Sequence, residues 1–176
     1  MFDALFTTTT EYKKLSHALS GKGACALFGL PASGRAQVYA ALCRQLDKPL
    51  CIVTPGEAEA TRFAADLNTL GIPAAVFPAR DYVLRPIEGT AREYEYRRLA
   101  VLGELVGGRL RAVAVPAEAL TQFTTPKEDF CANTRTLHAG DTLLRDDLLA
   151  ALFGAGYTRR AQVDGPGQFS VRGDIV

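Results

Sequence analysis

The sequence contains no tryptophan, one methionine and two histidines among its 176 residues. The two histidines, His17 and His138, stand far apart and next to no cysteine pair, so the ligand spacings of zinc sites are missing. The same scarcity leaves no Ser/His/Asp or Cys/His arrangement from which to build a nucleophile and its base. We therefore expect no catalytic residue, no metal ion and no cofactor.

Paired cysteines are also lacking. None of the four cysteines belongs to a CxxC motif, and Cys25, Cys43 and Cys51 lie inside apolar stretches. Free cysteines in such stretches are typical of the core of a protein from a reducing compartment. We expect these three thiols to be buried and unpaired.

Long apolar runs and an excess of one charge are absent too. No run approaches the ~20 residues of a membrane-spanning helix, and the formal net charge of +1 gives no overall attraction to nucleic acid or to anionic membranes. The opening residues, MFDALFTTTTEYKK, lack the basic start and apolar core of a signal peptide. We expect a cytoplasmic protein with no membrane partner.

Short apolar runs alternate with amphipathic segments over the first two thirds of the chain. This alternation predicts an α/β fold with a parallel sheet. The expected strands are 24–28, 50–54, 74–77 and 111–115, and the expected helices are 11–19, 33–46, 57–71, 91–108 and 117–123.

The alternation of apolar runs and amphipathic segments ends after residue 123. This change predicts two domains, 1–123 and 124–176. The second reads as α+β, with a helix over 145–157 and strands over 134–141, 159–163 and 168–176, the last two joined by the turn DGPG. The final run stops inside an apolar strand, so we expect this second module to be partial and the chain to be a fragment of a longer protein.

The stretch FGLPASGRAQ, residues 28–37, has the glycine spacing of a phosphate-binding loop. Gly29 and Gly34 keep that spacing, but Arg35 and Ala36 stand where the motif requires Lys and then Ser or Thr. Arg differs from Lys in reach and geometry, and Ala36 has no oxygen for a metal ion. Two interpretations stay open: a strand-to-helix turn with a degenerate, inactive loop, or a module that still binds nucleotide.

Three longer stretches carry a resemblance to a known family. ALFGLPASGRAQVYAALCRQLDKPLCIVTPGEAEATRFAADL resembles the opening of the UvrB-type module, and FPARDYVLRPIEGTAREYEYRRLAVLGEL resembles its version in the bacterial transcription-repair coupling factor, Mfd. LHAGDTLLRDDLLAALFGAGYTRRAQVDGPGQFSVRGDIV resembles the start of the next module of both families. The altered loop, and the short connection 79–90 where UvrB has a long hairpin, favour the coupling factor over UvrB.

The resemblance implies a fold and a role. The first domain would be of the P-loop NTPase-like (UvrB domain 1a-like) type, and the fragment would be non-catalytic and recruit UvrA in transcription-coupled nucleotide-excision repair. The longer parent protein would be an ATP-driven DNA translocase that also contacts RNA polymerase and double-stranded DNA. Family motifs place UvrA contacts at Arg159, Phe169 and Arg172, although Ser170 replaces a further arginine of UvrB.

Other residues admit more than one role. Phe169 shares strand parity with Val171, so it fits the core as well as a partner contact, whereas Arg172 has the opposite parity and faces solvent. Tyr82 and Arg85 form a stacking-plus-charge pair that could touch DNA. The charge-dense helix, with Arg92, Glu93, Glu95, Arg97 and Arg98, is expected to be a solvated face.

Overall fold

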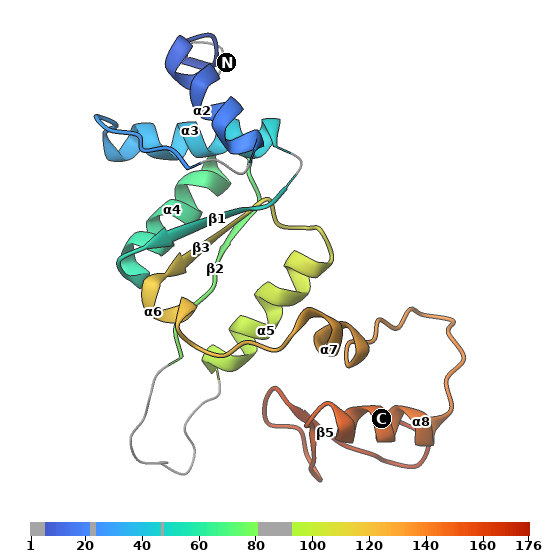
Figure 1. Cartoon of the computed structure of the whole chain (residues 1–176). Coiled ribbons are helices and arrows are strands. Elements are labelled where there is room, and N and C mark those ends of the chain that lie inside the picture. The colour runs from blue at the N-terminus through green and yellow to red at the C-terminus, as the bar shows by residue number, and fades with distance from the viewer. Residues whose placement is uncertain (1–5, 22–23, 47, 81–92) are drawn as a thin grey trace. The chain divides into compact units, whose positions relative to one another are not determined.

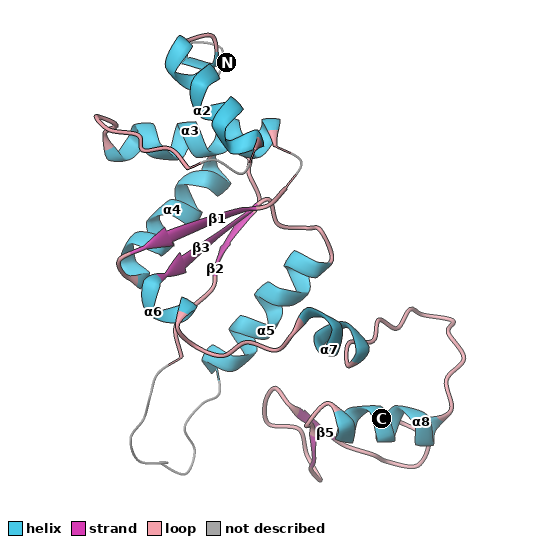
Figure 2. Cartoon of the chain, in the orientation of Figure 1, coloured by secondary structure: helices cyan, strands magenta, loops and turns pink. Residues whose placement is uncertain are grey.

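The computed structural model describes residues 6–21, 24–46, 48–80 and 93–176. The chain divides into two compact units, unit 1 (Met1–Phe123) and unit 2 (Thr124–Val176), each described by itself below. Figure 1 follows the chain by colour and Figure 2 by secondary structure. Among the described residues, no helix is both long and apolar enough to span a bilayer.

Unit 1 is an α/β structure around a three-stranded parallel sheet of order β1-β3-β2. The expected α/β class with a parallel sheet is thereby confirmed. Its elements are α2 (Thr10–Ser20), α3 (Ala32–Gln45), β1 (Leu50–Thr54), α4 (Glu57–Thr69), β2 (Ala74–Val76), α5 (Glu93–Val106), β3 (Ala112–Pro116) and α6 (Ala117–Leu120).

The central strand β3 is buried along its whole length because helices cover both faces of the sheet. Ala112 and Ala114 belong to the apolar cluster that contains Phe63 and Leu67 of α4. Val113 and Val115 belong to the cluster on the other face, which contains Val101 of α5. Figure 2 shows α4 and α5 on opposite sides of the three strands. A strand covered on both faces is continuously apolar, as in AVAVP.

The strand expected at 24–28 is wrong. These residues have no regular secondary structure and are exposed, with 88% of Phe28 accessible. The stretch is apolar enough for a buried strand, but it pairs with no strand of the described sheet. The burial expected for the thiols is wrong in the same way for Cys25 and Cys51, which are exposed, while Cys43 is buried.

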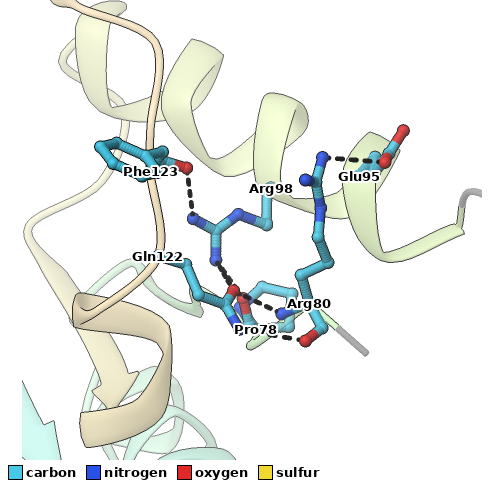
Figure 3. A network of polar contacts seen from close by, with 6 residues as sticks. All are labelled: Pro78, Arg80, Glu95, Arg98, Gln122 and Phe123. Atoms are coloured by element: carbon cyan, nitrogen blue, oxygen red, sulfur yellow. Dashed lines mark hydrogen bonds and ion pairs between the residues drawn. The ribbon is translucent and has the colours of Figure 1, made fainter. Parts of the chain in front are cut away.

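Arg98, expected on a solvated helix face, is instead buried, and this expectation is also wrong. Its Nη1 donates hydrogen bonds to the Pro78 carbonyl oxygen (2.8 Å) and to Oε1 of Gln122 (3.0 Å), and its Nη2 donates to the Phe123 carbonyl oxygen (3.5 Å). Its guanidinium also lies 4.1 Å from the centre of the Phe77 ring. Figure 3 shows how this network joins α5 to the ends of two other segments.

Unit 2 contains α7 (Lys127–Ala132), α8 (Arg145–Gly154), β4 (Thr158–Arg159) and β5 (Gln168–Phe169). The strand expected at 134–141 is wrong. There the Asp141 carboxylate accepts a hydrogen bond from the His138 backbone N–H (2.7 Å), and the Asp141 N–H donates to the His138 carbonyl (3.1 Å). Such a side-chain turn competes with strand pairing.

Candidate partner-binding surface

The arginines of the predicted UvrA site lie in the segment that follows α8. The strands here are shorter than the expected 159–163 and 168–176, and β4 pairs with β5 in parallel, with Arg159 opposite Phe169. The connection through residues 160–167 therefore crosses between parallel strands and is not a two-strand hairpin. The backbone N–H of Thr158 donates to the Gly167 carbonyl (2.9 Å) and that of Arg160 to the Phe169 carbonyl (2.8 Å).

Phe169 is the buried centre of this unit, with 5% of its surface accessible. Its ring meets that of Phe153 from α8 edge to face, with centroids 5.1 Å apart. This contact attaches the short β4–β5 pair to the helix. This packing fits the core position that strand parity allows for Phe169, and its contact with UvrA stays a prediction.

Arg172 lies beyond β5, at the start of a tight turn. The backbones of Arg172 and Ile175 exchange two hydrogen bonds, of 3.0 and 3.1 Å, around Gly173 and Asp174. Gly173 has φ +62°, which a residue without a Cβ adopts most easily. The sequence RGDI thus forms a two-residue reverse turn that presents Arg172 at its first position.

Arg145, at the start of α8, attaches this turn to the helix. Its Nη1 donates to the Gly173 carbonyl (3.3 Å) and lies 3.6 Å from a carboxylate oxygen of Asp174. Sequence reasoning missed this role because the two partners are 28 residues apart for the hydrogen bond. An arginine beside an RGD turn carries no local signal of contact.

The surface of this segment is basic. Residues 157–172 contain three arginines, Arg159, Arg160 and Arg172, and one acid, Asp164. All three arginines are exposed, and within the described structure none of their guanidinium groups forms an ion pair or hydrogen bond. Each therefore has its planar set of donors available for a carboxylate outside the unit.

The positions of the degenerate phosphate loop, in unit 1, are taken up by structural contacts. Helix α3 begins at Ala32, so Gly34 lies inside its first turn, where a Cβ would come within 3.3 Å of the Pro31 ring. Ala36 is 3% accessible and packs in the core. Arg35 lies 3.8 Å from the Glu59 carboxylate, which weakens its attraction for phosphate.

Gly29 is the one loop position with a backbone that glycine favours. Its φ is +82°, and nothing lies within 4 Å of the point where a Cβ would stand. It turns the chain toward α3 ahead of the proline-capped helix. The pair Tyr82 and Arg85, considered for DNA contact, lies outside the described residues, as does Arg92.

A model of the family described as "UvrB interaction domain" matches residues 136–176. This match covers α8, β4, β5 and the Arg172 turn. The chain is also 28% identical over 152 residues to the transcription-repair-coupling factor of Bacillus subtilis, an alignment that covers 85% of this chain and 13% of that protein.

The chain is similar to transcription-repair-coupling factors. A second example, from Staphylococcus aureus, is 25% identical over 150 residues, with 84% of this chain and 13% of that protein covered. The UvrABC system protein B of Chlorobium limicola is 26% identical over 165 residues, with 85% of this chain and 24% of that protein covered. These likenesses confirm the resemblance predicted from the sequence, and the chain spans 13% of the length of the coupling factors that it matches.

Proposed function

We propose that residues 124–176 are the start of a UvrA-binding module, and that the chain is an N-terminal part of a transcription-repair coupling factor. The observation that carries this proposal is the match of residues 136–176 to the UvrB interaction domain, a family named for an interaction. The chain would bring UvrA to the damage in nucleotide-excision repair without catalysing a reaction itself. RNA polymerase and double-stranded DNA would be partners of the longer protein.

Unit 1 would act in this proposal as a UvrB-like domain of P-loop NTPase type that has lost its nucleotide site. Support comes from the contacts that occupy the loop positions. A magnesium site needs an oxygen ligand, and Ala36 offers none. Arg35 lies beside a carboxylate rather than alone.

In unit 2, Arg159 and Arg172 would contact UvrA directly. Phe169 would support this surface through its packing against Phe153. Both arginines are exposed and Phe169 is buried. An arginine fork pairs with a carboxylate through two parallel hydrogen bonds, so an acidic surface on the partner fits this unit. The near-zero net charge of the chain means that the attraction has to come from this local patch.

The test is a binding measurement between purified UvrA and the 176-residue chain. Truncating one charge of a buried interfacial pair costs about 2–5 kcal/mol, so the double change Arg159→Ala, Arg172→Ala should abolish UvrA capture in a pull-down. The circular-dichroism melt should stay as in wild type, because neither side chain is tied into the fold. Wild-type binding by the double variant would place the UvrA surface elsewhere.

The matched control is Arg135→Ala. Arg135 is an exposed arginine of the same unit, and it lies just outside the matched residues. The Arg135→Ala variant should bind UvrA as wild type does. Equal loss in the control and in the double variant would show that overall charge, and not this surface, governs binding.

A further inference from the structure

Helices α2 and α3 of unit 1 border an open groove of about 620 Å³. Its volume falls in the ordinary range for small-molecule sites, about 300–1,000 Å³. Tyr12, Lys13, Ser16, His17 and Ser20 line it from α2, and Ala41, Arg44 and Gln45 line it from α3.

The residues of α2 that line the groove form one stripe. Lys13, Ser16, His17 and Ser20 are spaced i, i+3, i+4 and i+7, so they lie above one another on the same side of the helix. Beside this stripe, Tyr12 also lines the groove, and it packs with Val38, Ala41 and Leu42 of α3. The Tyr12 hydroxyl also donates to Oε1 of Gln45 (3.0 Å), which joins α2 to α3 at the groove.

The charged side chains among the described residues of the groove are basic. Within the part of the chain that the structure describes, no Asp or Glu lines it. Lys13 and His17 form no ion pair within the described part of the chain, although Lys side chains on helices commonly pair with acids. Arg44 reaches the groove from the facing helix, and its Nη2 donates to the Leu70 carbonyl (2.5 Å), which orients the guanidinium.

Hydroxyl groups complete the lining. Ser16 is 6% accessible, at a position where an apolar residue would pack against α3 at lower cost. Ser20 lies one turn further, and its hydroxyl donates to the Ser16 carbonyl (2.8 Å). Cations from two helices together with the Ser16 hydroxyl are groups of the kind that bind a phosphate, with its several acceptor oxygens.

We propose that this groove binds a phosphate group, carried by a small phosphorylated molecule. The site is separate from the degenerate phosphate loop, because Gly34 and Arg35 belong to the first turn of α3 and Arg44 to its last. Arg35 and Arg44 are nine positions apart on the helix, a distance of about 14 Å along the axis. The proposal is independent of UvrA binding, which concerns unit 2.

The test is calorimetric titration of the 176-residue chain with sodium pyrophosphate at constant ionic strength. Wild type should give saturable heat, and the double change Lys13→Gln, His17→Gln should weaken binding at least tenfold. Lys14→Gln is the matched control, since Lys14 is exposed on the same helix and does not line the groove. Its dissociation constant should stay within twofold of wild type.

Amide chemical shifts locate the bound pyrophosphate. Shifts in residues 10–20 and 41–46 would support the groove, while shifts confined to residues 29–36 would overturn the proposal in favour of the phosphate loop. Equal weakening by Lys14→Gln and by the double change would also overturn it, because diffuse charge would then explain the heat.

A second titration separates the two sources of phosphate. If a 12-base-pair DNA duplex binds more tightly than pyrophosphate, and only the Lys13, His17 double variant loses that binding, the phosphate chemistry of the groove stands and its source is nucleic acid. Saturable heat with neither pyrophosphate nor duplex would refute the proposal.

Discussion

Replacing Arg98 by alanine should destabilise unit 1 by about 3 kcal/mol, although the residue belongs to a helix whose sequence is rich in charge. The side chain leaves α5 and ends among the carbonyl oxygens of Pro78 and Phe123 and the amide of Gln122 (Figure 3). Alanine removes the guanidinium from all three acceptors at once. It also removes the cation from above the Phe77 ring.

The magnitude follows from the separate contributions. A buried acceptor left without its donor costs about 1–3 kcal/mol, which applies to the Pro78 carbonyl oxygen (2.8 Å), whereas Oε1 of Gln122 keeps its hydrogen bond from the Arg80 N–H (2.6 Å). A desolvated cation–π contact contributes about 2 kcal/mol. Relief of the charge's own desolvation, and water entering beside the exposed Phe123, offset part of this sum.

The assay is native-state hydrogen exchange of the β3 backbone amides, which are buried and report on unit 1 alone. A loss of about 3 kcal/mol corresponds to exchange about 150-fold faster in these amides, since each 1.4 kcal/mol is tenfold. Arg97→Ala is the control, because Arg97 is exposed and lies 5.9 Å from the Tyr94 ring centre. A change below about 0.5 kcal/mol for Arg98→Ala would refute the reasoning and class the residue with ordinary surface positions.

Three further measurements follow from other contacts. Calorimetry with Mg-ATP should show no saturable heat at millimolar nucleotide, because Ala36 is packed in the core; a micromolar dissociation constant, about −8 kcal/mol, would contradict this. Burial raises the pKa of the Cys43 thiol, so iodoacetamide should modify Cys43 more slowly than the exposed Cys25, and equal rates by mass spectrometry would count against the packing of α3. Hydrogen bonds from Arg109 lower the pKa of the Glu104 carboxyl. The pair therefore stabilises the fold above the ordinary carboxyl pKa and loses this effect as the pH falls through the lowered value; Arg109→Gln should raise the pKa in an NMR titration, and an unchanged midpoint would exclude the pair.

The sheet of unit 1 could be predicted because its strands are short apolar runs ended by glycine or proline. The same pattern at 24–28 predicted a strand that does not form. An apolar run indicates that a segment tends to be buried, but it does not show which strand or helix would cover it. Helix α3 begins at Ala32, one residue before the expected start at 33, and the Pro31 carbonyl accepts a hydrogen bond from the Arg35 N–H (3.1 Å) at this end.

The candidate surface was predictable only as a list of residues. Motif resemblance selected Arg159 and Arg172, and strand parity left Phe169 undecided between core and contact. The contact with Phe153 that decides the position of Phe169 crosses 16 residues, from α8 to β5. Arg98 was predicted to lie on a solvated helix face because its hydrogen-bond acceptors are 20 to 25 residues away in the sequence, so no local pattern indicates these contacts.

The Arg98 network also holds the point at which the chain leaves unit 1. The Gln122 side chain donates to the Arg80 carbonyl (3.0 Å) and accepts from the Arg80 N–H (2.6 Å), so the last residues of unit 1 are tied on two sides. Tension applied to the chain at residue 124 would therefore act on these short polar contacts before it reached β3, the central strand of the sheet.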